Sequence, residues 1–272
     1  KWIASQQLDW EELPGRVEAV IARRIGHLSQ ECQELMNVAC VEGEGFTAEV
    51  IAAVLEKDVQ RVRELLSREI GKQHQLVIAQ GLQPVGELSL SIYRFRHSLF
   101  QIYLYNHLDR VEKQQLHGKV AAILGQHYLQ DPEKLAEAAH VLARHFESAG
   151  LSEKSLHYYT MAGKYALQLS ASRAAIDHFQ RALSHLQALS PSEKRDWQAL
   201  DLHLSLGPPI TALRGWAAPE LEQNYQQAEA LCHRLADDAR LVPALWLLAV
   251  YHLGRAEHSA VDSLVERLHN LA

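Results

Sequence analysis

The sequence predicts a mainly α protein with one small β-hairpin in its first half and a long helical arm after it. Apolar residues recur at helical spacing along most of the 272 residues, between cap residues and sparse glycine (14) and proline (8). A single region, residues 75–97, breaks this pattern with short β-prone runs. The length favours two domains, since a domain typically contains about 100–200 residues.

The composition is that of a globular protein. Apolar residues make up 47% and charged residues 22%, which excludes a disordered tail or a collagen-like repeat. The net charge of −6 argues against a nucleic-acid carrier. No apolar run approaches the roughly 18 residues of a membrane span, so we expect no membrane contact. Three cysteines form no disulfide framework and favour a cytoplasmic protein. The start of the chain has no signal-peptide profile. Its first residue is Lys1 and not methionine, which suggests a piece of a longer protein.

The first hundred residues predict helices followed by a hairpin. Ser29 and Thr47 precede apolar runs and are predicted as N-caps. The apolar spacing predicts helices at 14–27, 30–41, 47–55 and 58–71. The runs on either side of Gly81, Pro84 and Gly86 then predict two strands, with these residues forming the turn. Helices followed by a two-stranded hairpin indicate a winged-helix domain over residues 11–100.

Helix after helix follows, with a helical linker expected over residues 101–132. Asp131-Pro132-Glu133 predicts a helix start, and Gly150 predicts a stop. Ser190-Pro191-Ser192-Glu193 predicts a capping box. Gly207-Pro208-Pro209 is predicted to end a helix, and residues 214–219 to form a turn before the next one.

Two predicted helices of the later part repeat one pattern. Residues 152–169 and 172–188 each place a large ring and a small alanine on one apolar face, with an offset of 20 residues. Small residues let neighbouring helices approach, and large ones fill the groove between them. This large–small pattern predicts a solenoid similar to tetratricopeptide (TPR) repeats over residues 133–272. The exposed curved surface of such a solenoid usually binds a partner.

The sequence contains no complete phosphate-binding loop and no G-x-S-x-G or H-E-x-x-H motif. Gly163-Lys164 lacks the other residues of a phosphate-binding loop. The 16 histidines lack metal-ligand spacing: His140 and His145 are five residues apart, and His178 and His185 are seven apart. We therefore expect neither a metal site nor catalysis within this chain.

Basic residues on the helix before the hairpin allow an alternative function. Arg61, Arg63 and Arg68 lie where DNA-binding winged helices enter the major groove. Residues 11–97 nevertheless contain ten Lys/Arg against thirteen Asp/Glu. Such a surface would neutralise few phosphates, so a solvated helix face is the favoured interpretation.

The segment 93–99 (YRFRHSL) is the most specific local feature. We expect Phe95 and Leu99 to anchor it in the core and to leave Arg94, Arg96 and His97 close together. A histidine at a helix start can donate to an anion, and the alternative is that His97 only caps or packs the junction.

Four segments in order resemble bacterial STAND-class signalling ATPases, which are multidomain relatives of the AAA+ ATPases. Residues 13–25 (LPGRVEAVIARRI) are similar to the opening of their winged helix, and residues 93–99 to their junction motif F-x-H-x-L. Residues 108–124 resemble the following linker. Residues 211–220 (TALRGWAAPE) resemble a segment of the repeat arm in predicted ATPases attached to adenylate/guanylate cyclase, kinase or LuxR-type domains.

The resemblance implies a regulatory and interaction fragment of a longer ATPase. Residues 1–10 would be the exit from an upstream nucleotide-binding domain, which would hold ATP or ADP and Mg²⁺; no cofactor is expected in this chain. The winged helix would restrain the nucleotide switch, with His97, and more weakly Arg94 and Arg96, reaching the ADP β-phosphate. The arm would bind a protein or small-molecule inducer. The alternative is a DNA-binding winged-helix regulator with a helical sensor arm.

Overall fold

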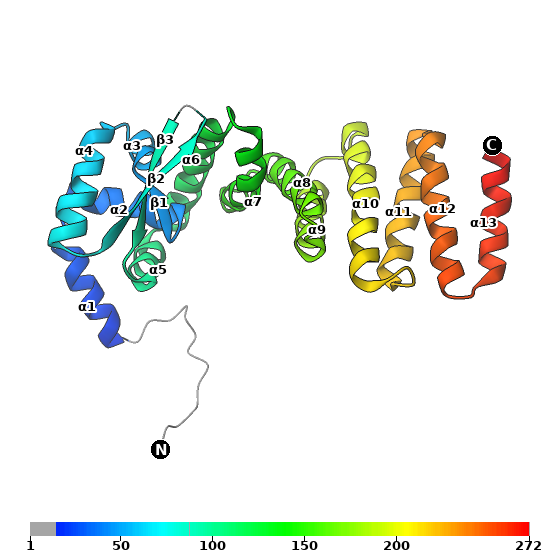
Figure 1. Cartoon of the computed structure of the whole chain (residues 1–272), viewed down its shortest axis with the longest axis horizontal. Coiled ribbons are helices and arrows are strands. Elements are labelled where there is room, and N and C mark those ends of the chain that lie inside the picture. Colours follow the sequence, from blue (N-terminus) through cyan, green and yellow to red (C-terminus); the bar gives the residue numbers. More distant parts are fainter. Residues whose placement is uncertain (1–14, 87, 272) are drawn as a thin grey trace, which may run out of the picture. The chain divides into compact units, whose positions relative to one another are not determined.

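The computed structural model describes residues 15–86 and 88–271. The predicted exit from a nucleotide-binding domain, residues 1–10, lies outside these residues. The chain divides into two compact units, one formed by the described residues up to 135 with residues 148–150, and the other by residues 136–147 and those from 151 onward. The predicted mainly α fold, with a small β-hairpin and a helical solenoid, is confirmed (Figure 1).

The first unit contains a three-stranded sheet among helices. Its elements are α1 (Gly15–Gly26), α2 (Gln30–Glu42), β1 (Gly45–Thr47), α3 (Ala48–Leu55), α4 (Val59–Glu64), the π-helix η1 (Leu65–Gln73), β2 (Val77–Val85), β3 (Leu88–Phe95), α5 (Ser98–His107) and α6 (Arg110–Tyr128).

The sheet is antiparallel with the order β1-β3-β2. The predicted hairpin is present, but its turn lies at Gly86, while Gly81 and Pro84 lie within β2. The register shifts between Ala79 and Gly81, where Gly81 has a φ of 126° that a side chain would strain. Strand β1 was not predicted, because three residues carry no periodic signal. Its pairing with β3 adds a third strand to the predicted hairpin.

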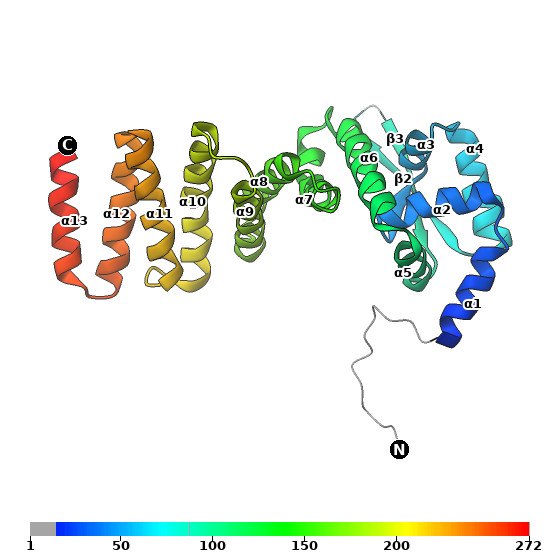
Figure 2. The same cartoon turned by 180° about the vertical axis from the view of Figure 1, so that it is seen from behind.

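The predicted helix 58–71 consists of two parts, α4 and η1. In a π-helix the backbone hydrogen bonds join residues that are five apart, as Leu66 and Gly71 are. A Cβ on Gly71 would lie 2.7 Å from the Leu66 carbonyl oxygen. Only glycine therefore fits this turn without a backbone shift. In the same unit, helix α6 packs against both α2 and α3 (Figure 2).

The second unit is built from helices alone. Helix α7 (Pro132–Ser148) contributes its residues from 136 to 147. The others are α8 (Ser152–Gln168), α9 (Ser172–Gln187), α10 (Glu193–Arg214), α11 (Pro219–Leu235), α12 (Asp238–Gly254) and α13 (His258–Leu271). From α8 to α13 each helix packs against the next (Figure 1).

The two predicted apolar faces are confirmed as core. Tyr159 of α8 is 1% exposed and Phe179 of α9 is 0% exposed. Gly163 lets the Phe179 ring approach so closely that a Cβ at this position would lie 2.5 Å from a ring carbon. The predicted alanines Ala162 and Ala182 are buried as well, at 4% and 0% exposed, whereas the contact between Gly163 and Phe179 was not predicted.

Helix α10 corrects two predictions. It continues through Pro208 and Pro209, which were expected to end it. Leu206 and Pro209 are buried, and the Tyr225 hydroxyl occupies the space where a Cβ on Gly207 would lie, so packing outweighs the hydrogen bonds that two prolines remove. The helix is capped by Ser192, whose side chain accepts from the Arg195 N–H, and not by the predicted box that begins at Ser190.

None of the helices within the described ranges combines the length and the apolar character that a membrane span requires.

Candidate functional site

The first candidate site is the end of β3, where the strand meets α5. Tyr93 and Phe95 are buried, and Arg94 and Arg96 point to the opposite, exposed side because strand residues alternate. The Phe95 ring packs against Phe46 of β1 with ring centres 5.1 Å apart. Strand β1 therefore fixes the junction.

His97 lies at the N-cap of α5 with its side chain exposed. It makes no side-chain cap hydrogen bond, and its ring centre is 6.1 Å from that of Phe100. Phe100 is the fully buried anchor, while the predicted anchor Leu99 is only half-buried. Arg94, within β3, and Arg96, directly before His97, are both exposed. The Arg94 guanidinium lies 3.9 Å from the Glu44 carboxylate.

The basic residues of the DNA-binding alternative are largely engaged within the unit. The Arg61 guanidinium is 3.0 Å from the Glu31 carboxylate, and that of Arg63 is 2.6 Å from Glu49. Within residues 15–86 and 88–271, Arg68 is exposed and forms no ion pair. These ion pairs could not be predicted from the sequence, since Glu31 lies on α2 and Glu49 on α3.

The carboxyl group of Glu42, at the end of α2, is a second polar feature of the first unit. One oxygen of Glu42 accepts a 2.9 Å hydrogen bond from the Thr47 hydroxyl, so Thr47 does not act as the predicted side-chain cap of α3. The other oxygen, Oε2, is buried without a partner among the described residues. Burial raises the pKa of Glu42 to about 8, against its ordinary 4.5. The Nε2 atom of His127 on α6 is also buried without a described partner, and burial lowers the pKa of this histidine.

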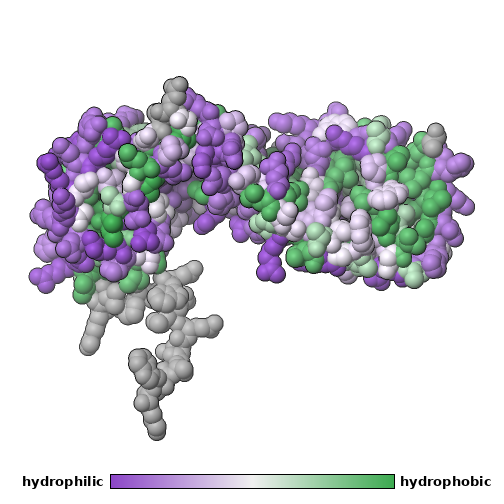
Figure 3. All heavy atoms as spheres, viewed as in Figure 1, coloured by the Kyte–Doolittle hydropathy of each residue, from purple (hydrophilic) through white to green (hydrophobic). Residues whose placement is uncertain are grey.

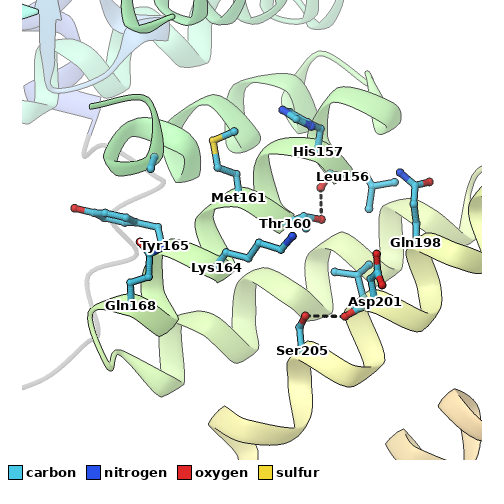
Figure 4. Close-up of a pocket in the computed structure, with 12 residues that line it drawn as sticks. Leu156, His157, Thr160, Met161, Lys164, Tyr165, Gln168, Gln198, Asp201 and Ser205 are labelled. Atoms are coloured by element: carbon cyan, nitrogen blue, oxygen red, sulfur yellow. Dashed lines mark hydrogen bonds between the residues drawn. The ribbon is translucent and has the colours of Figure 1, made fainter. Parts of the chain in front are cut away.

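The second unit contains a groove between α8 and α10 (Figure 4). It has a volume of about 410 Å³. One face of α8, with residues spaced by three and four, forms one wall, and one face of α10 forms the other. The groove is lined by Ala136, Leu156, His157, Thr160, Met161, Lys164, Tyr165, Gln168, Gln198, Asp201, Leu202 and Ser205.

The two charged residues that line the groove, Lys164 and Asp201, differ in their ion-pair partners. Lys164 extends from α8 toward α10 (Figure 4). No carboxylate in the described part of the chain lies within ion-pair distance of its ammonium. The only acidic lining residue, Asp201, is 2.7 Å from the guanidinium of Arg240 on α12, which itself lies over the Trp197 ring. This groove could not be predicted from the sequence, because the residues of its two walls lie about forty positions apart in the chain.

A titratable cluster joins α7, α8 and α9 and is structural in character. Glu147 accepts a 2.5 Å hydrogen bond from the Tyr159 hydroxyl and lies 3.3 Å from both Arg181 and His185. Burial, followed by the hydrogen bond to Glu147, raises the pKa of Tyr159 to about 12, which makes it a poor acid or nucleophile. The described residues contain no group of three or more ligands that could hold a metal ion.

Apolar surface is exposed in the last helices. It gathers over the α10 to α13 part in Figure 3. Val242, Trp246 and Leu253 share one face of α12 and are 41%, 54% and 57% exposed.

Comparison with known proteins assigns no family. No protein-family model matches this chain. An uncharacterized protein of Rhizobium meliloti (strain 1021) is 24% identical in an alignment 241 residues long that covers 84% of this chain. The chain spans 22% of the length of that relative. The crystal structure of BtubC (BKLC) from P. vanneervenii is 14% identical, with a TM-score of 0.30, and the match covers 82% of this chain and 88% of BtubC.

Proposed function

We propose that this chain is a non-catalytic regulatory and protein-interaction region of a STAND-type signalling ATPase. In this proposal the winged helix restrains a nucleotide switch, and the TPR-like arm binds a partner or an inducer. Nucleotide and Mg²⁺ belong to the nucleotide-binding domain of the same protein, and the protein acts in the cytoplasm. The observation that carries the proposal is the exposed His97 side chain, free of a cap bond, at the junction that resembles the STAND motif.

The position of His97 suits a contact with phosphate. The first N–H groups of α5 and the positive end of its dipole favour an anion, and Arg96 is exposed beside it. A charge-assisted hydrogen bond contributes about 1.5–3 kcal/mol. Coupling energies between allosteric sites have the same size, about 1–3 kcal/mol. One such bond is therefore enough to bias the switch toward the ADP state.

The test is the rate of ADP release from the full protein. His97→Ala is expected to accelerate release by about 10- to 150-fold, because the variant loses one charge-assisted bond to the phosphate. Release of a fluorescent ADP analogue in stopped flow measures this rate. His107→Ala is the matched control, since His107 lies at the other end of the same helix and stacks on Tyr103. Equal release rates for His97→Ala and the wild type would reduce His97 to a packing residue.

The DNA-binding alternative is kept because Arg68 is exposed on η1. We expect no salt-dependent binding of duplex DNA, since Arg61 and Arg63 are held by carboxylates. Anisotropy of a labelled duplex at about 50 and 200 mM salt checks this. Binding that weakens steeply with salt, and that Arg61→Gln with Arg68→Gln removes, would favour the alternative.

A further inference from the structure

We propose that the contact between α7 and α9 is a pH-sensitive hinge, in which protonation of His140 and His178 separates one end of the contact. Glu147 and His185 hold the other end together. The proposal goes beyond the proposed function, because it assigns to the arm a response to acidification. Helices α7, α8 and α9 follow one another along the chain, and this contact lies within the second unit (Figure 1).

The two ends of the contact arise from matching spacing on the two helices. His140 and Glu147 are seven residues apart on α7, and the same spacing separates two histidines of α9, His178 and His185. Seven residues make about two helical turns, so each pair lies on one face of its helix. The ring centres of His140 and His178 are 6.3 Å apart. The His185 Nε2 atom is 3.3 Å from the Glu147 carboxylate. One end therefore joins two bases, and the other joins a base to an acid.

Tyr159 of α8 lies between the two ends. Its ring centre is 6.0 Å from that of His178 and 5.7 Å from that of His185, and its hydroxyl donates to Glu147. Burial is the main cause that raises the pKa of Tyr159 to about 12, so it stays neutral over the pH range in which histidines titrate. The tyrosine therefore supplies no charge that could neutralise a protonated His178.

The neutral ring of His178 fits this site better than its cation does. The Nδ1 atom is buried and has no hydrogen-bond partner among the described residues. Both ring nitrogens carry a hydrogen in the cation, so the Nδ1–H group would be buried without an acceptor. The Asp177 carboxylate, at 3.9 Å from Nδ1, is too far away to accept a hydrogen bond.

The charged groups that face His178 come from two helices. Asp177 favours its protonation, whereas Arg181 of the same helix and His140 of α7 oppose it. Helix α10 also packs against α9, and none of its described residues places a charge on this histidine. Burial has the largest influence and lowers the pKa of His178 below its ordinary 6.5. The stability that the closed contact contributes is therefore complete above pH 6.5 and declines as the pH falls below this value.

His140 can take up a second proton. Its side chain is exposed, and its Nδ1 atom lies 3.0 Å from the Glu137 carbonyl oxygen of the same helix. A carbonyl oxygen only accepts, so Nδ1 carries the hydrogen and Nε2 takes up the added proton. Two positive rings whose centres are 6.3 Å apart repel each other, and separation of the helices at this end relieves the repulsion.

Acidification has the opposite effect at the other end. A protonated His185 carries the charge opposite to that of the Glu147 carboxylate, which also lies 3.3 Å from the Arg181 guanidinium. The same fall in pH therefore weakens the contact at His140 and strengthens it at Glu147. One end opens while the other stays closed, which is the motion of a hinge.

The test is hydrogen exchange of the 272-residue chain, followed by mass spectrometry at about pH 5.5 and 7.5. Each rate is divided by the intrinsic rate of an unstructured peptide at the same pH, which gives a protection factor. We expect the protection of residues 136–142 to fall about three- to tenfold at the lower pH, as repulsion between two partly exposed charges at this distance would produce. The protection of residues 143–148 is expected not to fall.

Variants of the two facing histidines identify the cause. His178→Leu is expected to abolish the fall in protection of residues 136–142, because leucine cannot take up a proton. His140→Gln is expected to reduce the fall to less than about threefold, because the repulsion is lost and only the buried His178 cation remains. His140 is exposed, so His140→Gln carries the test even if His178→Leu alters the packing around Tyr159.

Two further histidines serve as controls. His157→Gln is expected to keep the full fall, because His157 is exposed on α8 and its ring packs against Tyr158, outside this cluster. His185→Gln is expected to extend the loss of protection at low pH to residues 143–148, because the closed end then lacks its protonated partner for Glu147. Circular dichroism of all variants at about pH 7.5 checks that the helices are retained.

Equal protection of residues 136–142 at both pH values would overturn the inference. So would a fall that persists undiminished in His140→Gln or in His178→Leu, or one that disappears in His157→Gln. A wild-type fall that includes residues 143–148, or a His185→Gln variant that keeps their protection, would contradict the hinge. None of these outcomes affects the ADP-release test of His97→Ala, so the two proposals fail separately.

Discussion

Replacing Glu42 by glutamine is expected to stabilise the first unit, and the gain is expected to grow with pH. The carboxyl group is buried, and its pKa of about 8 lies above the ordinary 4.5. Between these two values the unfolded chain is ionised while the folded carboxyl keeps its proton, so folding takes up a proton. The stability contributed by the neutral carboxyl is complete below pH 4.5 and declines as the pH rises toward 8.

The size of the effect follows from the same two values. The glutamine variant is expected to be more stable by under about 1 kcal/mol at pH 5 and by about 3 kcal/mol at pH 7. Glutamine keeps an acceptor for the Thr47 hydroxyl and cannot ionise. Hydrogen exchange of β1 and β3 peptides, compared between variant and wild type at equal pH, measures the difference within this unit.

Glu44→Gln is the control for Glu42→Gln. The Glu44 side chain is 58% exposed and pairs only loosely with Arg94, at 3.9 Å. Its replacement is expected to change stability little and without a trend between pH 5 and 9. A gain for Glu42→Gln that is the same at all pH values, or a loss, would contradict a raised pKa for Glu42.

Gly163→Ala is expected to destabilise the arm by about 2 kcal/mol. In an open helix position the change would stabilise by up to about 1 kcal/mol, because alanine is the better helix former. Here the new Cβ would lie 2.5 Å from the ring of Phe179, which is fully buried, so the ring or the helix must shift. Overpacking therefore outweighs propensity. Trp197, Trp216 and Trp246 lie in the arm, so urea unfolding followed by tryptophan fluorescence reports on it.

Two further variants identify crowding as the cause. Gly118→Ala on α6 is the control, because a Cβ there would be 3.6 Å from that of Ala149, an ordinary contact, and we expect a small gain measured by hydrogen exchange of α6. Combining Gly163→Ala with Phe179→Leu is expected to lose less stability than the two single changes added together. Strict additivity would mean that the ring and the new methyl group do not interact.

The helices of this protein were predictable where local signals fix them. Ser29 accepts from the Cys32 N–H as its sequence position predicted, and α11 begins at Pro219 after the predicted turn. A cap or a first-turn proline acts within four residues, so the sequence alone specifies it. The prolines of α10 show the limit of local signals, because packing against Tyr225 outweighs them.

The candidate sites also contain some features that were predictable from neighbouring residues and others that depend on distant ones. His97 was predicted to lie where a strand ends and a helix begins, and the structure places it between β3 and α5. The ion pairs that engage Arg61 and Arg63 were not, since Glu31 and Glu49 reach them from other helices. The buried Glu42 oxygen, which has no partner among the described residues, was not predictable either, because its burial depends on every element packed around it.

By itself the sequence determined the mainly α class, the hairpin, the large–small faces of the arm and the junction at His97. Each of these depends on interactions between residues that are near in the chain, and periodicity and capping record them directly. Only the tertiary structure decided strand β1, the continuation of α10, the raised pKa of Glu42 and the groove in which Lys164 has no ion-pair partner among the described residues. These features depend on which distant side chains share a low-dielectric or crowded space, and that is set by the packing of helices far apart in sequence.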